Sequence, residues 1–230
     1  SGKVELKNVF FGYSRLSEPV IKDFSLSVEP GKSIAVVGAS GCGKSTVLNE
    51  LMKKQFDAYL VSTVMIFGIA GGNGLEHVDL QKYKKIYGID INEEYLSMVK
   101  KRYFQLGDLL ECHRIDLISE TEKLPQAELV IANLLIEYIG YDVFKRSVMK
   151  SEAKYVSCVI QINTDEGAWV SDSPYLHIFD RLDAVHHQME KNSLIETMNE
   201  INYQLIKTEE YSLPNGKKLL MLDFERKIPV

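Results

Sequence analysis

The N-terminal part of the chain alternates hydrophobic and polar residues twice before it becomes continuously apolar. Residues 4–12 and 19–28 show the period of two that is typical of half-buried strands. A turn signal, Glu29-Pro30-Gly31, precedes the apolar run at residues 33–37. We therefore expect two amphipathic strands followed by a buried strand.

From residue 44 onward, strand-like and helix-like patterns alternate. Apolar residues at helical spacing predict a helix over residues 44–56. The later patterns predict strands at 64–69, 86–90, 110–114, 128–132 and 155–162, and helices at 93–106 and 142–149. The chain ends with an expected helix at 194–205 and strands at 209–213 and 218–225 around the turn Pro214-Asn215-Gly216. The alternation predicts an α/β fold, in which helices cover both faces of a mostly parallel sheet.

The net charge, the short apolar runs and the number of cysteines argue against several classes of protein. The formal net charge of −5 argues against a protein that holds nucleic acid by neutralising phosphates. No apolar run approaches the ~20 residues that a membrane-spanning helix needs. The cysteines Cys42, Cys112 and Cys158 are odd in number and widely spaced, so they suit neither a disulfide framework nor a zinc cluster. We expect reduced thiols and a cytoplasmic protein.

A phosphate-binding motif follows the expected buried strand. The stretch from Gly38 to Thr46 matches G-x-x-x-x-G-K-[ST] between a strand and a helix, as the motif requires. Its backbone N–H groups would surround phosphate oxygens, Lys44 would reach the β- and γ-phosphates, and the Ser45 hydroxyl would bind Mg²⁺. The expected nucleotide-binding residues are Gly38, Ser40, Gly41, Cys42, Gly43, Lys44, Ser45 and Thr46. A glycine-rich turn without a ligand is the alternative.

Residues 3–46 resemble the opening of an ABC transporter ATPase domain, of the type found in peptide and bacteriocin exporters. The resemblance rests on Phe10-Phe11-Gly12-Tyr13, Phe24-Ser25-Leu26, Pro30-Gly31 and the phosphate loop, and it covers about a fifth of the chain. It implies that Tyr13 stacks on adenine, although Tyr13 is equally suited to packing. The Walker B acids, the glutamine loop, the L-S-G-G-Q signature and the switch histidine of that family are absent after Thr46. We therefore expect ATP and Mg²⁺ to bind at most, without hydrolysis.

A second glycine-rich loop follows the expected strand at residues 64–69. It contains Gly71, Gly72 and Gly74, and Asp90 closes the next expected strand sixteen residues later. Glycines that allow close backbone approach, and an acid that binds ribose hydroxyls, are typical of a Rossmann-like nucleotide site. Asn92 is expected to cap the following helix.

From about residue 48 to residue 226, the chain resembles a class I S-adenosylmethionine-dependent methyltransferase. The matching features are the loop at residues 70–74, Asp90, Asp116-Leu117, the stretch at residues 128–135 and the C-terminal order of elements, whose last strand is antiparallel in that family. The resemblance implies roles for six residues. Gly72 and Gly74 would approach the methionine part of the cofactor, Asp90 its ribose hydroxyls, Asp116 its adenine amine and Leu117 its adenine ring, while Asn133 would line the methyl-transfer side.

Two positions depart from the methyltransferase pattern. Gly68 stands where the family usually has an acid, and Ala70 stands where it usually has its first glycine. NAD or no cofactor at all remain alternatives, with Asp90 as a helix cap and Asp116 as a surface acid.

Methyl transfer depends mostly on proximity and orientation, so no fixed catalytic motif is expected. Substrate-binding residues should follow the strand ends, at Asn133, Glu137 and Tyr138 and within residues 163–191. That segment holds Trp169, Tyr175, His177, Asp180, Arg181, His186 and His187. Either His186 or His187 would suit a proton acceptor, although such a pair is more often two solvated helix residues.

The two resemblances meet inside one expected helix without a linker. We therefore expect a fusion, natural or engineered, of an ABC ATPase-like fragment at residues 1–47 with a methyltransferase-like domain at residues 48–230. The expected activity is methyl transfer from S-adenosylmethionine to a small molecule or peptide. The alternatives are a protein that binds ATP without hydrolysing it and a protein with no activity.

Overall fold

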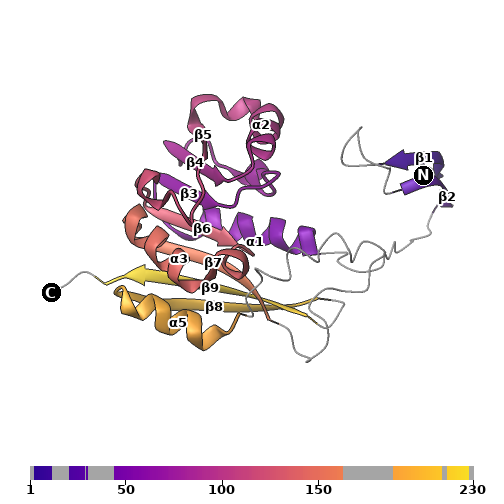
Figure 1. Cartoon of the computed structure of the whole chain (residues 1–230). Helices are drawn as coiled ribbons and strands as arrows, with labels where there is room; N and C mark the ends of the chain where they lie inside the picture. The colour runs from indigo at the N-terminus through magenta and orange to yellow at the C-terminus, as the bar shows by residue number, and fades with distance from the viewer. Residues whose placement is uncertain are drawn as a thin grey trace. The chain divides into compact units, whose positions relative to one another are not determined.

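The computed structural model describes residues 3–11, 21–28, 30, 44–162, 189–213 and 217–227. The chain divides into two compact units, Ser1–Ala39 and Ser40–Val230 (Figure 1). In the first unit, β1 (Val4–Phe11) and β2 (Ile21–Val28) pair as antiparallel strands, which confirms the two strands predicted there. The strand expected at residues 33–37 lies outside the described residues.

A seven-stranded sheet organises the second unit, with the strand order β5-β4-β3-β6-β7-β9-β8. The strands are β3 (Thr63–Phe67), β4 (Lys85–Asp90), β5 (Leu110–Arg114), β6 (Leu129–Asn133), β7 (Tyr155–Ile162), β8 (Tyr203–Ser212) and β9 (Lys218–Arg226). The first five strands in this order are parallel, whereas β9 is antiparallel to both of its neighbours. The predicted α/β class and the antiparallel C-terminal strand are both confirmed.

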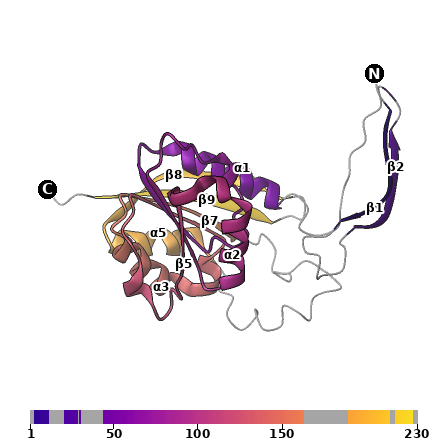
Figure 2. The same cartoon turned by 90° about the horizontal axis from the view of Figure 1, so that it is seen from above.

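Helices cover both faces of this sheet. They are α1 (Lys44–Ala58), α2 (Glu93–Arg102), α3 (Ile136–Ser151) and α5 (Lys191–Glu200), with short 3-10 turns at η1 (Leu75–His77), η2 (Phe104–Leu109) and η3 (Thr121–Lys123). The helices α1 and α2 contribute to one apolar cluster, while α3 and α5 contribute to another. Figure 2 shows α1 on one side of the sheet and α3 and α5 on the other.

The sequence explains why α1 packs on this sheet. Leu51, Met52, Gln55 and Phe56 are buried, and their spacing places them along one side of a helix. Leu51 joins a small cluster with Val159 of β7 and with β9, whereas Met52 and Phe56 join the cluster shared with α2. The predicted helix is confirmed and extends to Ala58.

The C-terminal helix is shorter than predicted. The structure ends α5 at Glu200 and begins β8 at Tyr203, so the helix expected up to residue 205 is wrong in its last turn. Asn202 has φ = 64°, a left-handed conformation that asparagine tolerates and that stops a helix. Tyr203 is buried and its hydroxyl donates a hydrogen bond to the Ala153 carbonyl, so tertiary packing draws this residue into the sheet.

Two other helix boundaries also differ from the prediction. The helix α3 begins at Ile136 and not at residue 142, because its first turn precedes a kink at Gly140, where φ is 74°. The helix α2 ends at Arg102, and η2 covers most of the remaining residues that were expected to be helical.

Candidate functional site

The glycine loop after β3 carries three left-handed backbone positions near its centre. They are Ala70 (φ = 46°), Gly72 (φ = 74°) and Gly74 (φ = 89°). A Cβ atom at Gly72 would lie 2.8 Å from Cε2 of Tyr103, and one at Gly74 would lie 2.5 Å from Cβ of Met52. Both glycines are therefore needed for packing against α1 and the end of α2, as well as for backbone conformation.

Gly71 is the glycine of this loop that has space around it. A Cβ atom at Gly71 would meet nothing within 4 Å. Sequence reasoning did not single out this residue, because a motif gives spacing and not the direction in which each Cα faces. The space makes Gly71 a further candidate for close approach of a ligand to the backbone.

Side chains from two helices hold the glycine loop in place. Glu76 accepts hydrogen bonds from the Gly74 N–H (3.1 Å), the Tyr103 hydroxyl (2.9 Å) and Nδ2 of Asn49 (2.6 Å). Burial and the Glu76 carboxylate together raise the pKa of Tyr103 to about 12. Nε2 of His77 also lies 2.7 Å from Oδ1 of Asn49. The loop is thus held by Asn49 of α1 and by Tyr103, the residue that follows α2.

Asp90 lies at the end of β4 and binds the glycine loop directly. Its Oδ2 accepts the Ala70 N–H (2.9 Å), and its Oδ1 accepts the Asn92 N–H (2.9 Å). Asn92 caps α2 as predicted, because its side chain accepts from the Glu94 and Tyr95 N–H groups. An ionised carboxylate has about four acceptor positions, so Asp90 keeps capacity for the hydroxyls of a ribose.

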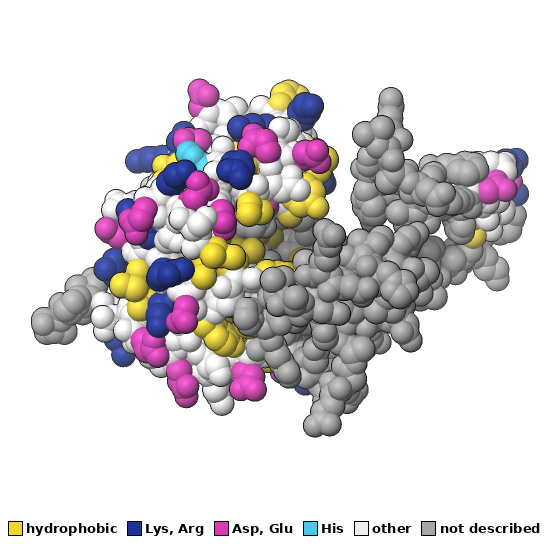
Figure 3. Space-filling view, in the orientation of Figure 1, with side chains coloured by type: hydrophobic (Ala, Val, Ile, Leu, Met, Phe, Trp, Pro, Cys, Tyr) yellow, Lys and Arg dark blue, Asp and Glu magenta, His cyan; other side chains and the backbone are white. Residues whose placement is uncertain are grey.

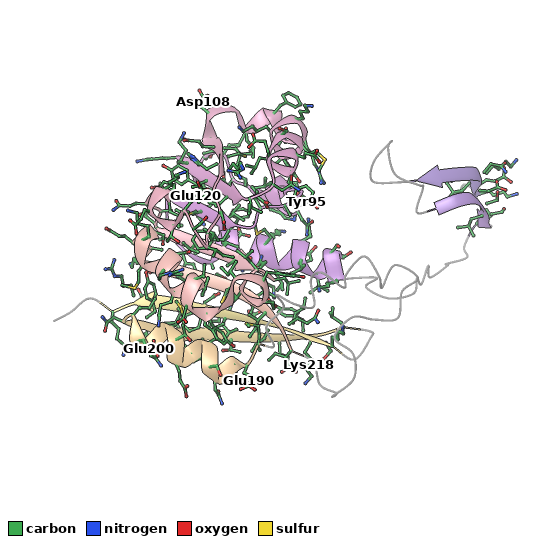
Figure 4. The ribbon with its side chains drawn as sticks, viewed as in Figure 1. Tyr95, Asp108, Glu120, Glu190, Glu200 and Lys218 are labelled. Carbon is green, nitrogen blue, oxygen red and sulfur yellow. The ribbon has the colours of Figure 1, made fainter. Side chains whose placement is uncertain are left out.

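Asp116 lies just beyond β5, the neighbour of β4 in the sheet. Its carboxylate accepts the Ile118 N–H (2.9 Å) and the Ser119 hydroxyl (2.7 Å), while its own N–H donates to Glu120, which is labelled in Figure 4. Leu117 is buried in the core. Because parallel strands end at the same edge of a sheet, the fold brings Asp90 and Asp116 to one edge.

Asn133 is directed toward α1. Its Nδ2 donates to Oε1 of Gln55 (2.8 Å), and its Oδ1 accepts from Nε2 of Gln55 (2.9 Å). The same Nε2 also donates to the buried hydroxyl of Ser157 on β7 (3.0 Å). Gln55 was not predicted as part of the site. The signal available in the sequence was a polar residue on the apolar side of the helix.

The phosphate-loop lysine also contacts the sheet. Nζ of Lys44 donates to Oε1 of Gln161 on β7 (2.8 Å), and the Gln161 N–H donates to Oε1 of Glu137 (2.9 Å). Burial lowers the pKa of Lys44 and raises that of Glu137. Nδ2 of Asn73 in the glycine loop donates to the Ser45 carbonyl (3.1 Å).

Several predicted residues lie outside the described part of the chain. In the phosphate-binding set they are Tyr13, Gly38, Ser40, Gly41, Cys42 and Gly43, whereas Lys44, Ser45 and Thr46 are described. On the substrate side they are Trp169, Tyr175, His177, Asp180, Arg181, His186 and His187. The two described cysteines, Cys112 and Cys158, are free thiols.

Several other properties of the described residues concern metal-ligand groups, membrane-spanning helices, surface charge and cavities. No group of three or more metal-ligating side chains occurs among them, and no helix formed by them could cross a membrane. Acidic and basic side chains are interspersed on the face shown in Figure 3. A cavity of about 700 Å³ lies beside η3 and α3, and it is lined by none of the predicted cofactor residues.

Comparison by sequence connects the N-terminal part to ABC transporters. The ABC transporter family model matches residues 21–58, which include all of α1. An ATP-dependent lipid A-core flippase of Pseudoalteromonas translucida is 45% identical over 69 residues, 30% of this chain and 12% of the flippase. A putative ABC transporter B family member 8 of Arabidopsis thaliana is 53% identical over 57 residues, 24% of this chain and 4% of that protein. The chain thus spans only a small part of these relatives.

Comparison by structure connects most of the chain to the methyltransferase fold. Magnesium protoporphyrin IX methyltransferase from Synechocystis PCC 6803 has a TM-score of 0.59 at 11% identity, over 85% of this chain and 90% of that enzyme. A geranyl diphosphate methyltransferase has a TM-score of 0.60 at 10% identity, over 83% and 93%. The [4+2]-cyclase SpnF has a TM-score of 0.61 at 11% identity, over 80% and 82%. The chain therefore combines an ABC transporter-like N-terminal sequence with the fold of these enzymes, as expected for a fusion.

Proposed function

We propose that the chain is an S-adenosylmethionine-dependent methyltransferase that acts on a small molecule or a peptide. The observation that carries the proposal is the pairing of Asp90 with the glycine loop, because this pairing fixes an acid and an open backbone at Gly71 beside one strand end. Solved structures of two similar folds contain S-adenosylmethionine or S-adenosylhomocysteine. When bound, S-adenosylmethionine supplies an electrophilic methyl group on a sulfonium.

The residues present fit this cofactor. Asp90 retains acceptor capacity for ribose hydroxyls, and Asp116 provides a second carboxylate at the same edge of the sheet. The backbone at Gly71 would allow close approach of the methionine part, with Gly72 and Gly74 shaping the loop.

We further propose that the methyltransferase domain begins near residue 48. The family model matches the whole of α1, yet the buried residues of that helix, Leu51 to Phe56, all pack on the sheet of the second unit. Residues 1–47 would then be an ABC ATPase-like fragment. The free thiols at Cys112 and Cys158 are consistent with a cytoplasmic location.

Calorimetric titration with S-adenosylhomocysteine tests this function. We expect micromolar binding to the unmodified protein and a loss of at least tenfold in Asp90→Ala. Asp108→Ala, which changes an exposed acid after α2, is the matched control and should bind normally. Absence of binding to the unmodified protein would contradict the proposal. A parallel titration with Mg-ATP on the unmodified protein and Lys44→Ala tests the alternative, in which the phosphate loop is the working site.

A further inference from the structure

Glu137 is a buried acid at the edge of the sheet where the strands β6 and β7 end. It lies in the first turn of α3, four residues after Asn133, and is 3% exposed. Its Oε1 accepts the Gln161 N–H, but its Oε2 has no hydrogen-bond partner in the structure described here. Buried polar atoms nearly always have a partner, so an unpartnered carboxylate oxygen calls for an explanation such as a ligand.

A partly buried cation lies near this carboxyl group. Lys44 reaches Gln161 from the N-terminus of α1, and the electrostatic interaction between Lys44 and Glu137 favours the charged form of each group. The other titratable groups that interact with this pair in the described residues are Tyr138 and Tyr141 of α3, Cys158 of β7 and Lys217 before β9. Gln161 thus links a cation on one side of the sheet to an acid on the other.

Glu137 lies at the edge of the sheet where this fold class binds its ligands. Ligands of open α/β sheets bind beyond the carboxyl ends of the parallel strands, and β6 and β7 pair with Asn133 opposite Val159. Both amide atoms of Asn133 bond to Gln55, whereas Oε2 of Glu137 has no hydrogen-bond partner among the described residues.

We propose that Glu137 is the base on the acceptor side of this site, and that it takes the proton from an O–H or N–H group of the methyl acceptor. The inference rests on the proposed methyltransferase function. As the acceptor's lone pair bonds to the methyl carbon, its proton moves to Oε2 of Glu137, and the electron pair of the broken carbon–sulfur bond stays on sulfur. Lys44 and Gln161 are positioning residues, because they hold the carboxyl group and favour its ionised form.

The test compares two ligands that differ in a methyl group and one positive charge. The Kd values of S-adenosylmethionine and S-adenosylhomocysteine are measured by calorimetry across a pH series. A sulfonium close to Glu137 favours the ionised carboxylate, so affinity for S-adenosylmethionine relative to S-adenosylhomocysteine should rise with pH. For a pKa change of one unit, the ratio of the two Kd values should change by about tenfold across the titration.

Three variants complete the test. Glu137→Gln should make the ratio of the two Kd values independent of pH while S-adenosylhomocysteine still binds. Lys44→Met keeps the acid but removes the cation, so the pH dependence should move to higher pH. Glu200→Gln, which changes an exposed acid at the end of α5, should behave like the unmodified protein.

Each other outcome contradicts a defined part of the inference. A ratio that does not depend on pH in the unmodified protein, or one that keeps its pH dependence in Glu137→Gln, would overturn the role of Glu137 alone. If neither ligand binds the unmodified protein, the proposed function fails, and this inference fails with it. If Glu137→Gln does not fold, Lys44→Met decides, because an unchanged midpoint in that variant would overturn the proposal.

Discussion

Gln55 and Asn133 exchange two amide hydrogen bonds, 2.9 and 2.8 Å long, between α1 and the end of β6. Gln55 belongs to the stretch that resembles ABC transporters, whereas Asn133 belongs to the methyltransferase-like sheet. A third bond from Gln55 reaches the Ser157 hydroxyl. These hydrogen bonds between the buried Gln55 amide and the sheet make α1 an integral helix of the second unit.

This arrangement predicts that Gln55→Ala destabilises the protein. Gln55 is 1% exposed, and its removal would take away the partner of both amide atoms of Asn133 and one hydrogen bond of the Ser157 hydroxyl. We expect the free energy of unfolding to fall by about 2 kcal/mol in urea denaturation. Lys53→Ala, at an exposed position of the same helix, is the control and should change it by less than about 0.5 kcal/mol. Equal losses in the two variants would show that the amide network has no special role.

The sequence was sufficient to predict the sheet but not all of the helix boundaries. Parallel strands such as β3 and β6 are buried on both faces, so each appears as a short apolar run between turns. The end of α5 could not be predicted in this way, because the apolar residues Tyr203 and Leu205 fit a helical and a strand pattern equally well. The bond from the Tyr203 hydroxyl to Ala153 decides this ambiguity, and it depends on a residue fifty positions away.

The candidate site was predictable in the same uneven way. Asp90 and the glycine loop follow from local spacing, and the structure places them in direct contact. The contacts of Lys44 with Gln161 and of Gln55 with Asn133 join residues that are 117 and 78 positions apart. No local pattern encodes such pairs. Their prediction would have required the packing of α1 on the sheet.

A charged contact between α1 and β8 predicts a loss of stability in acid. Nζ of Lys54 binds Oε2 of Glu209 (2.9 Å), and hydrogen bonds from Lys207, Tyr211 and Lys54 lower the pKa of Glu209 to about 2. Because the folded-state pKa lies below the ordinary value of 4.5, the stabilisation is complete above pH 4.5 and is lost as the pH falls toward about 2.

Urea denaturation of Glu209→Gln across this pH range measures the effect. The variant should be less stable than the unmodified protein at neutral pH, by less than about 1 kcal/mol because the pair is partly exposed. The difference should shrink as the pH falls through the window. Glu196→Gln on α5 is the control. A difference that persists unchanged at the lowest pH would contradict the assignment.

Replacing Gly74 or Gly71 of the glycine loop by alanine should change the free energy of unfolding by very different amounts. Gly74→Ala would place a Cβ 2.5 Å from that of Met52 at a residue with φ = 89°, so we expect a loss of roughly 2–4 kcal/mol in the free energy of unfolding. Gly71→Ala adds a methyl group to open space and should change stability by less than about 1 kcal/mol.

Binding of S-adenosylhomocysteine separates the two roles further. If the backbone at Gly71 faces the cofactor, Gly71→Ala should weaken binding by roughly tenfold although the protein stays folded, because its methyl group would occupy the space that the ligand needs. A Gly71→Ala protein with normal stability and normal affinity would place the cofactor elsewhere, and a Gly74→Ala protein as stable as the parent would contradict the packing of α1 on the loop.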